Sequence, residues 1–133
     1  MTVHAIPTKL QGSFLIVDGD ALSSGVESID RGLRFDPCNA VHRIVVKTGC
    51  RVVLAGEWSD RGIGPESVFG QCLRSTIGKF QAQDVLKQMH SSIEDIGDAK
   101  SWIETHKPER VAVLTAAIGD AVVADAVSTL GKA

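Results

Sequence analysis

Short apolar runs rich in β-branched side chains occupy the front of the chain. Residues 3–8 alternate loosely between apolar and polar side chains, and Ser13–Val17 follow as a continuous apolar run. Val41–Val46 and Arg51–Ala55 form a second pair of runs, joined by a short turn around Gly49. Runs of this kind joined by short turns are typical of β-hairpins. The pattern therefore predicts two hairpins, one after the other.

Between these hairpins lies a polar stretch, Asp18–Ala40, which is rich in Gly, Ser, Asp and Arg. Successive turn signals predict a long loop there, with one short strand around Gly32–Phe35. Loops of this length are uncommon inside compact domains and are often functional. The stretch is therefore a place to expect a site.

The middle of the chain changes to a helical period. Apolar side chains recur every three to four residues from Pro65 to Phe80, which predicts a first helix beginning at the proline. Asp84 can cap a second helix that ends at Gly97, and Asp98 can cap a third that stops before Pro108.

The end of the chain returns to strand-like runs. Val111–Ala117 predict a buried strand, and Ala121–Ala124 predict its partner across a turn at Gly119. Val127–Leu130 fit either a strand or a helix. The fold class is therefore α+β: a single domain, residues 1–133, with β-hairpins front and back bracketing a helical middle.

Composition narrows the classes of function. The chain has 133 residues, 44% of them hydrophobic, which suits one core. The formal charge is -2 and no run of like charge is longer than two residues, which disfavours nucleic acid as a partner. We expect no membrane partner, because no apolar stretch approaches the roughly 20 residues of a membrane span and the N-terminus lacks the apolar core of a signal peptide.

The reactive residue types fit no standard motif. Three cysteines without a CxxC pair suit reduced thiols and a cytoplasmic location. The four histidines have no two at ligand spacing, and no nucleotide-binding motif occurs, so we expect neither a metal nor a cofactor.

Thr2 offers one candidate for nucleophilic chemistry. It follows Met1 and is small enough for that methionine to be removed. The free threonine would then carry a hydroxyl nucleophile and an α-amine base, with a pKa of about 8, on the same residue.

The order of elements that begins at Thr2 resembles the proteasome β-subunit family, most nearly its bacterial two-part, ATPase-dependent branch. The resemblance rests on the strand ending in Gly19-Asp20, the strand pair that closes in Ala55-Gly56, the helices, and the Gly119-Asp120 turn. It covers most of this sequence but only about the first two-thirds of a family domain. It implies a shortened αββα N-terminal-nucleophile sandwich, a homo-oligomer, and an ATPase or a peptide as partner.

The resemblance also implies the roles of individual residues in an amide hydrolase or peptidase. Thr2 would attack the peptide carbonyl, Asp20 would support the site, Arg43 would stand where the family has a lysine, and the amide of Gly56 would serve the oxyanion. Arg43 departs from the family because an arginine stays charged and cannot relay a proton.

Each of these residues also has a purely structural interpretation. Asp18 and Asp20 suit turns, Arg43 suits a solvated strand position, and Gly56 suits the end of a strand. Trp58 is either a cover over the core or an exposed interface anchor. Two functions therefore stay open: a threonine hydrolase, and a non-catalytic self-assembling or binding protein on a related sandwich.

Overall fold

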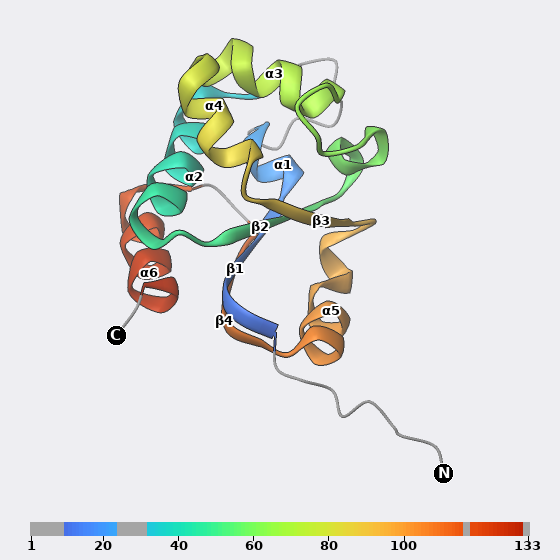
Figure 1. The fold of residues 1–133 in the computed structure, drawn as a ribbon, viewed down its shortest axis with the longest axis vertical. Coiled ribbons are helices and arrows are strands. Elements are labelled where there is room, and N and C mark those ends of the chain that lie inside the picture. The colour runs from blue at the N-terminus through green and yellow to red at the C-terminus, as the bar shows by residue number, and fades with distance from the viewer. Residues whose placement is uncertain (1–9, 24–31, 116–117, 132–133) are drawn as a thin grey trace.

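One parallel sheet of four strands forms the centre of the computed structural model, which describes residues 10–23, 32–115 and 118–131 (Figure 1). The strand order is β3-β2-β1-β4. The strands are β1 (Leu10–Asp18), β2 (Arg51–Ala55), β3 (Met89–Ile93) and β4 (Pro108–Leu114). Val17 of β1 pairs with Leu54 of β2 on one side and with Leu114 of β4 on the other.

The central strand β1 is buried on both faces. Its residues Phe14, Leu15, Ile16 and Val17 are each at most 1% exposed. A strand covered on both faces has no solvent side, so its sequence is a continuous apolar run rather than an alternating one. This explains the run that the sequence shows before Asp18.

Four of the longer helices in the described residues contribute to the larger core on one face of the sheet, together with Ala21 and Leu22. These helices are α2 (Phe35–Thr48), α3 (Val68–Ile77), α4 (Lys79–Leu86) and α6 (Asp120–Leu130). Their buried side chains pack with Leu15, Val17 and Leu54 of the sheet. Figure 1 shows α2 and α6 side by side on this face.

The opposite face carries one helix, α5 (Ala99–His106). Its Trp102 packs against Phe14, Ile16 and Val53 in a second, smaller core. The indole ring also stacks on the imidazole of His106 at 4.3 Å between centroids. Helices therefore flank the sheet on both faces, as in doubly wound α/β proteins (Figure 1).

Three short helical segments lie at the carboxyl ends of the strands. They are α1 (Gly19–Leu22) after β1, η2 (Glu57–Arg61) after β2, and η3 (Ile96–Asp98) after β3. None of the helices in the described ranges is long and apolar enough to cross a membrane.

The mixture of helices and strands is confirmed, and so are several individual elements. Two predicted strands are present: Ser13–Val17 lies in β1, and Arg51–Ala55 is β2. Of the predicted buried strand Val111–Ala117, the part Val111–Leu114 lies in β4, where only Leu114 is buried, and residues 116–117 lie outside the described residues.

Two of the predicted helices are present, one of them in part. The third helix is present as α5, and the first is present in part as α3, with Phe69, Leu73 and Ile77 buried as the period predicts. The predicted start at Pro65 is wrong because Ser67 caps the helix, and Phe80 belongs to α4 and is exposed.

The predicted hairpins are wrong wherever the structure describes them. Strands β1 and β2 pair in parallel, and Val41–Val46 belong to α2 instead of a strand. The β-branched side chains of this segment misled the propensity argument, because Val41, Ile44 and Val45 are buried at helical spacing. The predicted strand at residues 3–8 lies outside the described residues.

The rear hairpin and the second helix are also wrong. Ala121–Ala124 belong to α6, whose Val123, Ala126 and Leu130 face the core. The predicted helix from Asp84 to Gly97 contains the end of α4, the edge strand β3 and part of η3. Gly32 and the two residues after it form no strand.

Candidate functional site

Two of the residues predicted for the site lie beside Asp18, at the carboxyl end of β1. The backbone N–H of Asp20 donates to Oδ1 of Asp18 at 3.0 Å. Gly56 directly follows the neighbouring strand β2. A Cβ atom on Gly56 would lie 3.6 Å from Oδ1 of Asp18. Thr2 lies outside the described residues. The structure therefore brings Asp20 and Gly56 together around Asp18.

Arg43 lies elsewhere. It belongs to the middle of α2 and not to a strand, so its predicted position is wrong. Its Nη1 atom lies 3.2 Å from Oδ1 of Asp120, the first residue of α6, and both side chains are exposed. This surface ion pair links two helices and contributes little free energy, because water and salt screen it.

The electrostatic environment of Asp18 makes ionisation of its carboxyl group less favourable than in an exposed aspartate. Burial at the end of the sheet raises the pKa of this carboxyl group above 3.8, and the hydrogen bond from Asp20 only partly opposes the shift. The negative charges of Asp20 and Asp95 raise the pKa further. The carboxyl group of Asp18 therefore lies close to other negative charges, and the hydrogen bond from the backbone N–H of Asp20 orients it.

The topology places Asp18 at a special point of the sheet. The chain steps from β1 to β2 to β3 in one direction and then returns past β1 to place β4 on the other side. Ligands of open parallel sheets bind beyond the carboxyl ends of the strands at such a reversal. Thr115 follows β4, the strand on the other side of this reversal. It comes directly after Leu114, which pairs with Val17.

A rigid wall supports this end of the sheet. The indole N–H of Trp58 donates to the hydroxyl of Ser23 at 2.8 Å, and the ring is only 2% exposed. Trp58 thus covers the core, which confirms the first of its two interpretations. Gly19 makes this packing possible, because a Cβ atom there would lie 3.0 Å from both the indole Cδ1 and the carbonyl oxygen of Ala55.

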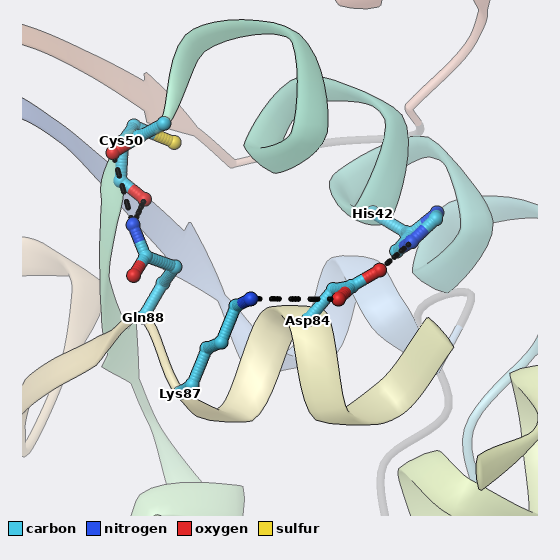
Figure 2. Close-up of polar contacts among 6 residues, drawn as sticks. His42, Cys50, Asp84, Lys87 and Gln88 are labelled. Atoms are coloured by element: carbon cyan, nitrogen blue, oxygen red, sulfur yellow. Dashed lines mark hydrogen bonds and ion pairs between the residues drawn. The ribbon is translucent and has the colours of Figure 1, made fainter. Parts of the chain in front are cut away.

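A further polar cluster joins α2 to α4 (Figure 2). His42 and Lys87 lie on either side of the Asp84 carboxylate, at 3.1 and 3.7 Å. The side-chain amide of Gln88 donates to the carbonyl oxygens of Gly49 and Cys50. The His42 contact joins α2 to α4, the Gln88 contacts join the end of α4 to the segment before β2, and the Lys87 contact lies within the end of α4. The cluster therefore links parts of the helical layer.

Sequence reasoning missed Asp18 as the centre of the site and missed Asp95 altogether. The available signal was the position of Asp18 directly after a continuous apolar run, which is typical of a parallel strand and its carboxyl end. The hairpin interpretation concealed this signal. It treated Asp18 as a turn residue.

The metal-ligating side chains of the described ranges form no group of three or more that could hold an ion. Comparison of the chain with protein-family models, with curated proteins and with solved structures found no match. The geometry of the site is therefore the basis for a functional assignment.

Proposed function

We propose that the chain binds a small cationic ligand at the carboxyl edge of its sheet, and that the Asp18 carboxylate pairs with the charge of this ligand. One observation carries the proposal: a partly buried carboxyl group with a raised pKa lies at the topological reversal of the sheet. Perturbed carboxyl groups in such positions are typical of functional sites.

The charges around Asp18 define the chemistry of the ligand. Asp20 and Asp95 add negative charge close to it. A protonated amine could form an ion pair with the Asp18 carboxylate, and a hydrated divalent cation could be held by one or two carboxylates without a full protein cage. An anionic ligand would be repelled unless a cation accompanied it.

Putrescine, an organic dication, and Mg²⁺ are suitable probes for this site. We expect at least one of them to raise the melting temperature of the wild-type protein, because a ligand that binds only the folded state stabilises it. Asp18→Asn and Asp20→Asn should abolish the shift. Asp125→Asn, which removes an exposed carboxylate from α6, is the matched control and should keep it. Absence of a shift with both probes, or a shift that survives in Asp18→Asn, contradicts the proposal.

A threonine amide hydrolase of the proteasome β type is a second proposal. The proximity of Asp20 and Gly56 to Asp18 favours it. The amide N–H of Gly56, which the resemblance assigns to the oxyanion, donates to the carbonyl oxygen of Ile93 at 3.2 Å and would have to be released. It needs Thr2 to reach this edge from Leu10, although β1 separates Leu10 from Asp18 by about 26 Å at a strand's usual rise. It also implies the shortened αββα sandwich, although the described residues form one sheet with helices on both faces. An ATPase or a peptide would be the partner.

The state of residue 1 decides this second proposal. Mass spectrometry of the purified protein should show that Met1 is removed, because only a free Thr2 amine can act as the base. Quantitative retention of Met1 ends the proposal. If Met1 is removed, a Thr2→Ala variant that still cleaves a test peptide ends it equally.

Self-assembly without catalysis is the alternative to an enzyme. The exposed apolar side chains Phe35, Val46 and Phe80, which are 53%, 60% and 80% exposed, favour it. Light scattering at micromolar concentration tests it, and a homo-oligomer that becomes monomeric in Phe80→Ser is the expected result. A monomeric wild-type protein contradicts it.

A further inference from the structure

A cationic groove lies on the helical layer and is distinct from the site at Asp18. Two adjoining hollows of about 390 and 630 Å³ share the residues Glu66, Arg74 and Lys79. The segment before α3 forms one wall, and α3 and α4 contribute the rest. Leu86 and Lys87 extend the smaller hollow along α4.

The wall of this groove is a tightly built segment. The hydroxyl of Ser67 accepts a hydrogen bond from Gly70 N–H at 3.0 Å and donates to the carbonyl oxygen of Gly64 at 2.6 Å. Gly70 allows this turn to lie against α3, because a Cβ atom there would be 2.5 Å from the Gly64 oxygen and 2.7 Å from the Pro65 oxygen. The segment therefore has little freedom to move.

The same segment orients Arg74. Its Nη1 atom donates to the carbonyl oxygen of Pro65 at 2.7 Å, and this is its one polar contact among the described residues. An arginine has five N–H donors, so most of the guanidinium group is available to a ligand in the groove. The bond to Pro65 removes much of the side-chain entropy that binding would otherwise cost.

The charges of the groove favour an anion. Lys79 is exposed and has no polar partner within the described ranges, and Lys87 has only a long contact of 3.7 Å with Asp84. Glu66 is the one acidic side chain among those that line the two hollows. Among the described residues that line the hollows, three cations thus accompany one anion, and Asp84 lies outside this lining beside Lys87. The formal net charge of the whole chain is -2.

We propose that this groove binds a small polyanion that carries phosphate or carboxylate groups. Arg74 supplies a planar, partly fixed guanidinium that can hold two oxygens of one anionic group. Lys79 and Lys87 are mobile point charges that can hold a second group, and Leu86 adds an apolar contact. A ligand with a single negative charge would use only part of this arrangement.

Isothermal titration calorimetry with tripolyphosphate and with citrate tests the groove. The wild-type protein should bind at least one of the two anions, and binding should weaken as salt rises from about 50 to about 300 mM because the cations are exposed. The two anions distinguish phosphate from carboxylate recognition.

Variants of the groove make the test specific. Arg74→Gln keeps a donor for the Pro65 oxygen but removes the charge, and Lys79→Gln removes a charge without a structural partner. Each should weaken binding by roughly five- to tenfold. Lys100→Gln, which removes an exposed lysine from α5, should bind as the wild type does, and so should Asp18→Asn. No binding of either anion, or equal weakening in Lys100→Gln, overturns the proposal.

Discussion

The Nε2 atom of His42 lies 3.1 Å from Oδ2 of Asp84, and this contact joins the middle of α2 to α4. The hydrogen bond from His42 is the main cause that lowers the pKa of the Asp84 carboxyl group below 3.8, and Lys87 lowers it further. A lowered pKa in the folded state means that the ionised carboxylate favours folding above the unfolded value. This contribution is lost as pH falls through the folded pKa.

Asp84→Asn should therefore change the acid limb of the stability profile. We expect the free energy of unfolding of the wild type to fall more steeply than that of Asp84→Asn as pH falls below the unfolded value of 3.8. Urea denaturation at a series of pH values measures it. Asp125→Asn is the control and should keep the wild-type slope. Identical slopes for Asp84→Asn and the wild type would show that the contact contributes nothing to folding.

Gly19→Ala should destabilise the fold. A methyl group at this position meets the Trp58 ring and the Ala55 carbonyl oxygen, both at 3.0 Å. Crowding of a packed core costs about 1–3 kcal/mol, and a shift of the indole should also change tryptophan fluorescence. Gly64→Ala is the matched control, because a Cβ atom there has nothing within 4 Å. Equal stability of both variants contradicts the packing described for Trp58.

The strands were more predictable than their pairing. Arg51–Ala55 coincide with β2, because a buried strand has a dense apolar sequence whichever way its neighbours run. Parallel pairing depends on contacts between segments far apart in the chain, and Ala55 meets Asp18 only in the folded sheet. Short apolar runs carry no information on this pairing.

Helix α2 shows how local propensity can mislead. Its second half, Val41–Val46, has the β-branched composition of a strand, but tertiary burial at helical spacing decides the outcome. Gly49 does adopt a left-handed conformation, with a φ of 67°, as the turn prediction required. It ends a helix there instead of joining two strands.

The edge strand β3 was missed for a different reason. Its sequence, Met-His-Ser-Ser-Ile, is partly polar because it lies at the edge of the sheet, with side chains alternately exposed and half-buried.

The candidate site was predicted only in part for a related reason. Asp20 and Gly56 were selected from their positions in the family resemblance. The proximity of Asp95 to Asp18 depends on the order of the strands, which the sequence does not show.

Ser13→Ala should weaken the attachment of α6 to the sheet. The buried hydroxyl of Ser13 donates to the carbonyl oxygen of Leu130 at 2.6 Å and accepts from Nε of Arg110 at 2.9 Å. Loss of the hydroxyl leaves both partners unsatisfied, at a cost of about 1–3 kcal/mol. Chemical denaturation measures the loss, and Ser128→Ala on the exposed side of α6 should show none. A Ser13→Ala variant as stable as the wild type contradicts this role.

The three cysteines should differ in reactivity. Burial raises the pKa of Cys38 to about 12 and also raises the pKa of Cys50, so few thiolates form at either position, whereas Cys72 is half-buried. Iodoacetamide at pH 8 should therefore label Cys72 in the native protein and the other two only after denaturation. Peptide mass spectrometry identifies the labelled sites, with Cys72→Ser as the control. Early labelling of Cys38 contradicts the burial described here.

Asp18 is the centre of the proposed cation site. The pKa of its carboxyl group is raised by burial and by neighbouring negative charge. A raised pKa means that the contribution of this group to stability is present at low pH and is lost as pH rises through the folded value. Ionised Asp18 therefore costs stability at neutral pH. Residues kept for function often carry such a cost.

The direct measurement is the melting temperature of Asp18→Asn and of the wild type at pH 7, with and without putrescine or Mg²⁺. Asparagine can still accept the hydrogen bond from Asp20 but carries no charge, and it caps a helix about as well as aspartate does. We predict that Asp18→Asn melts at a higher temperature than the wild type and no longer responds to the probe that stabilises the wild type. A variant that melts at a lower temperature and still responds to that probe would contradict the assignment of the site to Asp18.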